Sequence, residues 1–247
     1  MRILAPSPSH ISKLFPDVLP NEIQRTELTE AFAPLQWQDT TSQPREFVIP
    51  DHFLPHDSLG MIEDFSASSQ FDRLRAWQGP AIWTVAFDGN GFHGQYARPW
   101  QTIRGNLFLC LAMPVHLLID MADKIQRIPA EILARELNRF SVSNVHAQIK
   151  LPNDVVVYPS AGDITGYKIA GSLTEMRISG QRITQVRYGI GMNLVSAPTV
   201  SDPGHLPACA FTDFYPSAAI PENRLLPHFF QAIIDGIGNI LLFHEDN

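Results

Sequence analysis

The chain has 247 residues, of which 45% are hydrophobic and 17% are charged, and a formal net charge of −7 at pH 7. These values are ordinary for a globular protein that buries a substantial core, as one large domain or one domain with an extension. The acidic balance, without clustered Lys and Arg, argues against a nucleic-acid-binding surface. Two cysteines cannot form a disulfide framework, and there is neither a signal-peptide region nor an apolar run near the ~18 residues of a membrane span. We therefore expect a soluble, cytoplasmic protein without a membrane partner.

The first 50 residues are interrupted by prolines and contain one predicted helix. Asn21 is a suitable N-cap for a helix over residues 21–32, in which Ile23, Leu28 and Phe32 are apolar at roughly helical spacing. We interpret residues 1–46 as an N-terminal extension that wraps a core formed by residues 47–247.

Residues 47–87 predict a strand, a helix and a second, buried strand. Apolar residues alternate with acidic residues and serines over 47–78, and 81–87 is an apolar run. His52 and His56 have the spacing of a metal-binding pair on a helix, but a proline lies between them, so exposed histidines are the better interpretation. The buried strand leads into the glycine-rich segment 88–100, where backbone N–H groups are able to approach an anion closely.

The rest of the chain predicts two helices and several strands. Leu117–Phe140 has apolar residues at helical spacing. Val155–Tyr158 and Tyr167–Glu175 are apolar runs separated by a Pro/Ser/Gly turn, which indicates two paired strands. Gln185–Val195 predicts a further strand, and a helix follows from about Glu222 to Ile234. Strands and interspersed helices of this kind indicate an α+β fold with a mixed sheet.

Polar residues at the ends of the paired strands suggest more than a structural hairpin. Asn153 and Asp154 precede one strand, and Lys168 opens the other. Only four of the 18 basic residues are lysine, and two of these, Lys150 and Lys168, lie in this segment. An ammonium group is a compact charge suited to a phosphate or acyl-phosphate oxygen, which favours a functional site. The alternative is a β-hairpin with ordinary turn and edge polar residues.

Three motifs resemble those of biotin protein ligases, in the same order. Lys150–Asp154 resembles the family's Lys-Trp-Pro-Asn-Asp motif, with Leu151 in place of tryptophan. Residues 168–175 resemble Lys-(Ile/Leu)-(Ala/Gly)-Gly-Ile-Leu-Val-Glu, and residues 189–194 resemble Gly-(Ile/Ala)-Gly-Ile-Asn-Val. The chain is thereby identified as a member of the biotin/lipoate protein ligase superfamily. The resemblance implies a class II synthetase-like catalytic domain, a mixed and largely antiparallel sheet flanked by helices, here without the small C-terminal β-barrel of biotin ligases.

The glycine-rich segment departs from the family pattern. The ligase loop reads Gly-Arg-Gly-Arg-x-Gly-Arg-x-Trp, and this chain retains only its last arginine, as Arg98, before Trp100. His93 and Gln95 stand where two other arginines are expected, and Asn106 follows in a Gly-Asn-Leu stretch like that of the ligases. Each missing charge-assisted bond to a phosphate or carboxylate is worth about 1.5–3 kcal/mol. The loop alone therefore does not support biotin and ATP as the substrates.

The resemblance implies a two-step reaction. Mg²⁺ and ATP would convert a carboxylic acid (biotin, lipoate or octanoate) to its acyl-adenylate, and the acyl group would pass to a lysine of an acceptor protein. Lys168 would contact the carboxylate and phosphate oxygens, while Asn153 and Asp154 would hold metal-linked phosphate and orient the amine. Loss of one such donor costs about 2.7–4 kcal/mol in the transition state. The other substrate- and nucleotide-binding residues that it implies are His93, Gly94, Gln95, Arg98, Trp100, Asn106, Lys150, Gly171, Gly191 and Asn193.

Other functions within the superfamily stay open. Octanoyl transferases use no ATP and form a thioester on a cysteine positioned by a lysine in Lys-Ile-Ala, which Lys168–Ala170 resembles; Cys209 would then be the nucleophile. A small core thiol is the other interpretation of Cys209, and the one expected for Cys110. Lipoate ligases have a Lys-Ile-Ser-Gly-Ser sequence similar to residues 168–172. A member that binds a ligand without catalysis is a further alternative.

Overall fold

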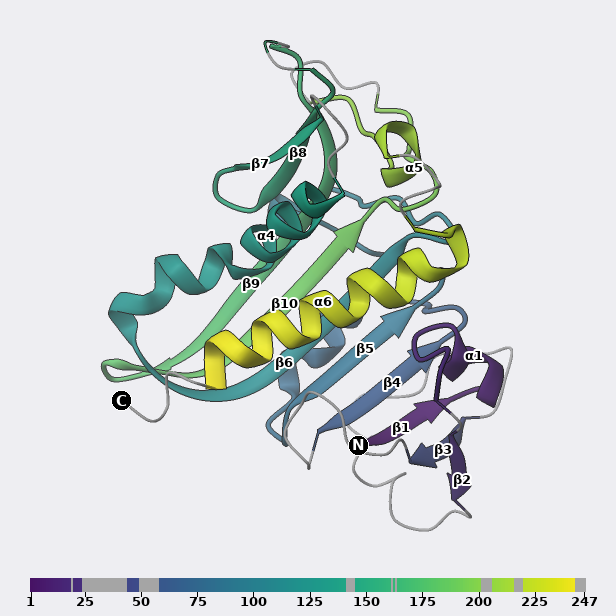
Figure 1. Ribbon diagram of the computed structural model, residues 1–247. Helices are drawn as coiled ribbons and strands as arrows, with labels where there is room; N and C mark the ends of the chain where they lie inside the picture. The colour runs from purple at the N-terminus through teal and green to yellow at the C-terminus, as the bar shows by residue number, and fades with distance from the viewer. Residues whose placement is uncertain are drawn as a thin grey trace.

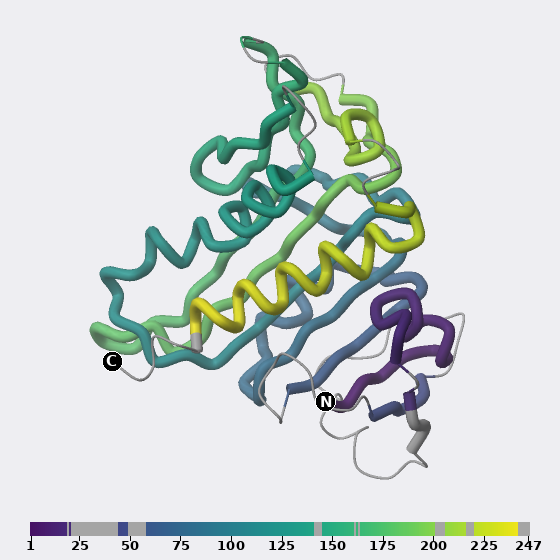
Figure 2. The backbone as a smooth tube through the Cα atoms, in the orientation of Figure 1, coloured from purple at the N-terminus to yellow at the C-terminus, as the bar shows by residue number. Residues whose placement is uncertain are grey.

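A computed structural model describes residues 1–18, 20–23, 44–48, 58–140, 145–160, 162, 164–200, 206–215 and 220–242. Within these residues ten strands form one sheet in the order β2-β3-β1-β4-β5-β6-β10-β9-β8-β7 (Figures 1 and 2). The β1–β4 and β4–β5 pairs are parallel and the other neighbours are antiparallel, so the predicted α+β fold with a mixed, largely antiparallel sheet is confirmed. The strands are β1 (Arg2–Ala5), β2 (Asn21–Ile23), β3 (Arg45–Val48), β4 (Leu59–Glu63), β5 (Ile82–Ala86), β6 (Leu107–Leu118), β7 (His146–Lys150), β8 (Asp154–Tyr158), β9 (Tyr167–Ser179) and β10 (Arg182–Met192).

Two long helices, α4 (Ala122–Arg139) and α6 (Glu222–Leu242), cover one face of the sheet (Figure 1). The main hydrophobic core lies between these helices and the strands. Ile125 of α4 is fully buried, and its carbonyl accepts a hydrogen bond of 2.8 Å from the hydroxyl of Tyr188 on β10. Two short helices, α1 (Pro8–Ser12) and α5 (Phe211–Phe214), also contribute residues to this core. None of the helices in the described part of the chain is long and apolar enough to cross a membrane.

The opposite face of the sheet carries the short helix α3 (Gln70–Arg73) and the 3-10 turn Leu74–Ala76. Side chains on a strand alternate between the two faces of its sheet. On β10, Tyr188 and Ile190 therefore point to the long helices and the intervening Gly189 lies under α3. A second, smaller hydrophobic cluster fills this face, with Phe71, Leu74, Trp77, Cys110 and Ala112 among its members.

The N-terminal segment departs from the sequence prediction. The helix expected over residues 21–32 is wrong at its start, because Asn21–Ile23 is strand β2, paired with β3; residues 24–32 lie outside the described residues, as do His52 and His56. In its described part the extension does not wrap the core but enters the sheet, with β1 between β3 and β4. The backbone N–H and C=O groups of β2 form hydrogen bonds with β3. The spacing of apolar residues within residues 21–32 does not reveal such a distant partner. The predicted boundary between the N-terminal extension and the rest of the chain, between residues 46 and 47, stays a prediction. Strand β3 spans this boundary.

The other predicted elements agree with the structure apart from their ends. The strand over 81–87 is β5, and the paired strands are β8 and β9. The helix predicted over 117–140 begins only at Ala122, because Leu117 and Leu118 still pair with β10 at the end of β6. The C-terminal helix starts at Glu222 as expected and continues past the predicted end to Leu242.

Candidate active site

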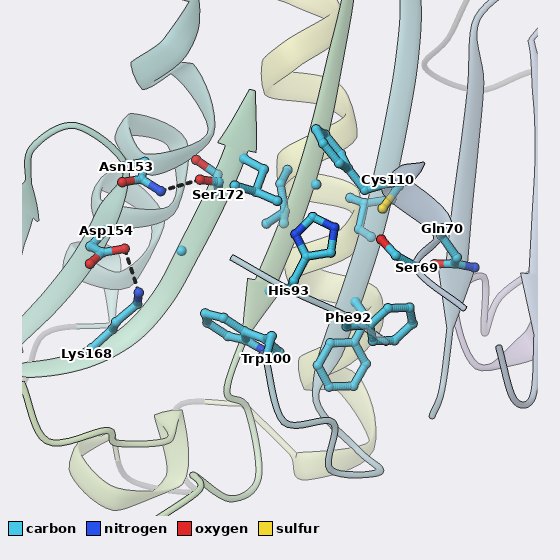
Figure 3. A pocket seen from close by; sticks show the side chains of 18 residues that line it. Ser69, Gln70, Phe92, His93, Trp100, Cys110, Asn153, Asp154, Lys168 and Ser172 are labelled. Atoms are coloured by element: carbon cyan, nitrogen blue, oxygen red, sulfur yellow. Dashed lines mark hydrogen bonds and ion pairs between the residues drawn. The ribbon is translucent and has the colours of Figure 1, made fainter. Parts of the chain in front are cut away.

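A cavity lies on the face of the sheet that carries α3 (Figure 3). Strands β6, β10, β9 and β8 form its floor, and α3 and the loop 88–100 form its walls. Its volume is about 60 Å³. The lining residues are Ser69, Gln70, Phe71, Phe92, His93, Trp100, Phe108, Leu109, Cys110, Asn153, Asp154, Lys168, Gly171, Ser172, Leu173, Gly189, Ile190 and Gly191.

An ion pair stands at the β8–β9 side of this cavity. The Nζ of Lys168 lies 2.7 Å from Oδ1 of Asp154, and the two side chains are 31% and 24% exposed. Gly171 lies beneath the pair: a Cβ there would be 3.2 Å from Asp154 Oδ1 and 3.3 Å from Lys168 Nζ, close enough that these side chains would have to shift slightly. The adjacent Asn153 is buried, and its amide nitrogen donates to the carbonyl of Ser172.

A β-bulge places Lys168 on the cavity side of the sheet. Val155 pairs with Ala170 and Val156 pairs with Lys168, so Ile169 is an extra residue on β9. An extra residue shifts the alternation of side chains by one position. Lys168 therefore shares a face with Gly171, three residues away, and its ammonium lies 5.3 Å from the ring centroid of Trp100.

His93 is held in the wall by two hydrogen-bond acceptors. Its Nε2 lies 2.8 Å from Oδ2 of Asp72 on α3, and its Nδ1 lies 3.1 Å from the carbonyl oxygen of Gly94. Because neither acceptor carries a proton to donate, both ring nitrogens are satisfied only in the imidazolium form. Burial lowers the pKa of His93, but the hydrogen bonds to Asp72 and Gly94 outweigh it, and the net pKa lies above the ordinary value. The two acceptors thus favour the protonated form of His93.

Two aromatic rings lie directly on the glycines of β10. A Cβ at Gly189 would be 2.9 Å from the ring of Phe71, and a Cβ at Gly191 would be 2.7 Å from the indole of Trp100. Both distances are shorter than real carbon–carbon contacts, so any side chain at these positions would displace a ring. The glycines found in the third motif therefore make room for the aromatic wall of the cavity.

The structure gathers only part of the predicted site. Seven of the predicted residues line the cavity: His93, Trp100, Asn153, Asp154, Lys168, Gly171 and Gly191. Gly94, Gln95 and Arg98 belong to the outer part of the loop and do not line it. Arg98 is exposed, with its guanidinium 5.6 Å from the ring of the exposed Tyr96. Lys150, at the end of β7, is also exposed and outside the cavity.

Asn106 and Asn193 form a buried structural network outside the cavity. The side-chain oxygen of Asn106 accepts hydrogen bonds from the backbone N–H groups of Leu194 and Val195, at 2.9 and 3.1 Å, and its amide donates to the carbonyl of Ser196 at 2.8 Å. Asn193 donates to the carbonyl of Cys209 at 3.1 Å. These hydrogen bonds hold the backbone that follows β10.

Cys209 does not have the properties of a nucleophile. It is 1% exposed, does not line the cavity, and its thiol lies 3.7 Å from the carbonyl oxygen of Tyr167. Burial, together with the carboxylate of Asp213, raises the pKa of this thiol to about 12. Since the thiolate is the reactive form, burial and the raised pKa do not favour Cys209 as an activated nucleophile, and that alternative stays a prediction. Cys110 does line the cavity, but burial raises its pKa to about 12 as well.

Several lining residues were missed by sequence reasoning. Ser69, Gln70 and Phe71 come from α3, and Cys110 comes from β6. The signal in the sequence was the group of polar residues Ser66, Ser68, Ser69 and Gln70, between Phe65 and Phe71. Ser66, Ser69 and Gln70 are all buried in the structure, which is unusual for polar side chains without a structural or functional role.

The residues present fit a metal ion that is held mainly by a nucleotide. In the described ranges no three His, Cys, Asp or Glu side chains converge as a metal site. Mg²⁺ often uses one or two carboxylates together with substrate phosphates. Asp154 and the side-chain oxygen of Asn153 are the candidates for such contacts. A wider groove of about 610 Å³ along α4 and α6 contains none of the predicted residues.

Comparisons with known proteins agree with this geometry. The model of the Biotin/lipoate A/B protein ligase family matches residues 66–193, more than half of the chain. The structure of biotin protein ligase from Leishmania major in complex with biotin is 19% identical, with a TM-score of 0.54 over 76% of this chain and 75% of that one. Its complex with biotinyl-5-AMP gives 21% identity, a TM-score of 0.54 and 76% of each chain. Biotin protein ligase from Aquifex aeolicus in complex with biotin and ATP is 16% identical, with a TM-score of 0.51 over 76% of this chain and 72% of that one. A search of curated proteins found no match.

Proposed function

The chain belongs to the biotin/lipoate A/B protein ligase family, and from this premise we propose that it activates a small carboxylic acid with ATP and transfers the acyl group to a lysine of an acceptor protein. The acid would be of the biotin or lipoate type. The observation that carries the proposal is the Lys168–Asp154 pair, which lines the cavity together with apolar residues such as Phe71, Leu109 and Leu173. The match of the fold to ligases solved with biotin, biotinyl-5-AMP and ATP supports it.

In the first step a carboxylate oxygen of the acid attacks the α-phosphorus of ATP, an O–P bond forms, and pyrophosphate leaves. Negative charge accumulates where the two anions meet, and preorganised positive groups stabilise it most effectively in a site shielded from water. Lys168, on β9, would take this role, and the protonated form of His93, in the loop 88–100, would add a second positive charge at the cavity. Mg²⁺, when bound with ATP, would offset phosphate charge, with Asn153 and Asp154 as its protein contacts.

In the second step the neutral amine of the acceptor lysine attacks the acyl carbon. An amide bond forms, AMP leaves, and one proton is released from the amine. A carboxylate that accepts a hydrogen bond from the amine orients it and favours loss of this proton. Asp154 is the carboxylate that lines the cavity, and its contact with Lys168 keeps it close to the position of the adenylate.

ATP–pyrophosphate exchange tests the first step directly. Purified protein is assayed separately with biotin, lipoate and octanoate, alongside Lys168→Ala. We expect exchange that depends on one of these acids and falls at least ~100-fold in the variant. Lys124→Ala, which changes an exposed lysine on α4, is the matched control and should retain exchange.

Absence of exchange with all three acids would overturn the ligase proposal for these substrates. Tight binding of one acid without exchange would identify a ligand-binding member of the family instead. Acyl transfer without ATP that depends on Cys209 would establish the transferase, which the buried and protonated thiol does not favour.

A further inference from the structure

The outer part of the glycine-rich loop, residues 93–99, has few contacts of its own to hold its shape. The N–H of Gly94 donates to the carbonyl of Arg98 at 2.7 Å, which closes a short two-stranded ladder. A ladder of this length is marginally stable by itself. Tyr96 and Ala97 at its tip have φ angles of 57° and 56°, in the left-handed region that is unfavourable for residues with a Cβ. The shape of the ladder therefore depends on contacts with the rest of the molecule.

Within the described residues, one hydrogen bond joins this outer part to another element. Nε2 of His93 lies 2.8 Å from Oδ2 of Asp72, on α3. The ring of His93 also meets the ring of Phe71 edge-on, with the centroids 6.5 Å apart. Together with Phe92 and Trp100 of the same loop, His93 lines the cavity (Figure 3). The contact with Asp72 therefore holds one wall of the cavity in place.

Ion pairs fix Asp72, the partner of His93, to the sheet. Nη2 of Arg75 lies 3.3 Å from Oδ1 of Asp72 and 3.0 Å from Oε1 of Glu175, on β9. The other carboxylate oxygen of Glu175 pairs with Nη2 of Arg187, on β10, whose side chain is 5% exposed. Opposite charges alternate along this series, so each group attracts its neighbours. Asp72 thus keeps its position whether or not His93 carries a charge.

The bond to Asp72 depends on the protonation of His93. The imidazolium donates to both of its acceptors, Asp72 and the carbonyl of Gly94, whereas the neutral ring has a single N–H. Loss of the proton removes one hydrogen bond and the charge attraction to the carboxylate. Burial and the nearby Arg75 lower the pKa of His93, but the hydrogen bonds to Asp72 and Gly94 raise it above its ordinary value.

The other titratable groups at the cavity are already neutral or paired. They are Cys110 on β6, Asp154 on β8 and Lys168 on β9. Burial raises the pKa of Cys110 to about 12, so this thiol stays neutral, and Asp154 and Lys168 form an ion pair with each other. Asp72 and Arg75 are therefore the charged groups that act on His93.

We propose that His93 and Asp72 form a proton-controlled latch, which holds the outer part of the loop against α3 while His93 is protonated and releases this wall of the cavity when the proton is lost. The latched loop binds the proton more tightly than the released loop. Its advantage is fully present below the ordinary histidine pKa of about 6.5 and is lost as the pH rises through the raised pKa of the latched state. This inference goes beyond the proposed function, and its test needs neither acid nor ATP.

Hydrogen–deuterium exchange of the unliganded protein, read by mass spectrometry, tests the latch. Exchange is measured between pH 5.5 and pH 9, and each rate is divided by the intrinsic chemical rate at that pH. Protection of the amides in residues 93–100 should fall by ~3- to 10-fold over this range, because a partly exposed charge-assisted bond contributes modestly. Peptides from α4 provide the baseline and should keep their protection.

Variants of the two latch residues separate charge from shape. Asp72→Asn and His93→Gln keep polar side chains without the charge, so both should show low protection of residues 93–100 at every pH. His93→Arg carries a permanent charge and should keep the loop protected up to pH 9. Asp17→Asn is the matched control: it neutralises an ion-paired carboxylate, the partner of Arg224, that does not line the cavity, and it should follow the wild-type curve.

Two results would overturn the latch. One is wild-type protection of residues 93–100 that stays constant from pH 5.5 to pH 9, a result that needs no variant to fold. The other is an undiminished pH dependence in Asp72→Asn and His93→Gln, because another group would then control the loop. Absence of ATP–pyrophosphate exchange would count against the proposed function only, since the latch is measured without substrates.

Discussion

Lys168 Nζ and Asp154 Oδ1 lie 2.7 Å apart, beside Gly171 and next to a bulge in β9. The extra residue Ile169 turns Lys168 to the cavity face, and Gly171 leaves the space that the ion pair occupies. In the proposed reaction the ammonium of Lys168 would stabilise the carboxylate and phosphate in the first step. The carboxylate of Asp154 would bind the acceptor amine in the second step. The two half-reactions should respond differently when only the carboxylate is changed.

Asp154→Asn should separate the two steps. The variant keeps Lys168, the shape of the side chain and one oxygen that is able to contact Mg²⁺, so we expect acid-dependent ATP–pyrophosphate exchange to fall less than the transfer step does. Transfer to the acceptor amine should fall by ~10²- to 10⁴-fold, the usual effect of losing a positioned base. Single-turnover transfer from preformed acyl-adenylate is the measurement. Equal losses in both assays would show that Asp154 acts mainly by positioning Lys168.

The hydrogen bonds of His93 make stability depend on pH. The folded-state pKa is raised, so the stabilisation is fully present below the unfolded-state pKa of about 6.5 and is lost as the pH rises through the folded-state pKa. The charged groups that act on His93 are Asp72, which raises its pKa, and Arg75, which lowers it. Asp72→Asn should remove this dependence. Between about pH 6 and pH 9 the free energy of unfolding should therefore decrease more in the wild type than in the variant.

Urea unfolding at a series of pH values checks this expectation. Asp123→Asn, on the exposed surface of α4, is the control and should follow the wild-type curve. Parallel curves for the wild type and Asp72→Asn would contradict the imidazolium assignment.

Asn106→Ala should destabilise the fold. The substitution leaves the N–H groups of Leu194 and Val195 and the carbonyl of Ser196 without their side-chain partner. Buried groups left unsatisfied cost about 1–3 kcal/mol each, so we expect a loss of at least about 2 kcal/mol in the free energy of unfolding, measured in urea. The exposed Asn90→Ala should change it by less than ~0.5 kcal/mol. A loss of activity without a loss of stability in Asn106→Ala would instead indicate direct contact with a ligand.

Cys209→Ala should retain acyl transfer. The thiol is buried and its pKa is about 12, so it is almost entirely protonated at neutral pH and unsuited to thioester formation. The expected cost is a modest loss of stability from the small void. Transfer is measured with the acid that supports exchange, and iodoacetamide labelling of the native protein should be slow. Abolished transfer in a variant with an intact fold would restore the thioester mechanism.

Sequence reasoning recovered the features that depend on nearby residues. The paired strands, the C-terminal helix and the motif residues Asn153, Asp154 and Lys168 follow from short runs of apolar and polar residues. The predicted helix over residues 21–32 is wrong at its start, because pairing with a strand more than twenty residues away outweighs local spacing. Asn106 was predicted to bind substrate or nucleotide; its side chain is bonded to the distant segment 194–196, which the sequence did not indicate, and its binding role stays a prediction.

The sequence by itself determined the family, the sheet-forming segments and the identity of the central lysine, because these depend on motifs and periodicities within short windows. Only the tertiary structure decided which residues share the cavity. Gln70 enters it from α3, Cys110 from β6 and His93 from the loop, far apart along the chain. These residues come together because of the order of the strands and because the bulge in β9 changes which side chains face the cavity. The glycines of β10 also leave room for the rings of Phe71 and Trp100. These are properties of packed strands, which no local window of sequence contains.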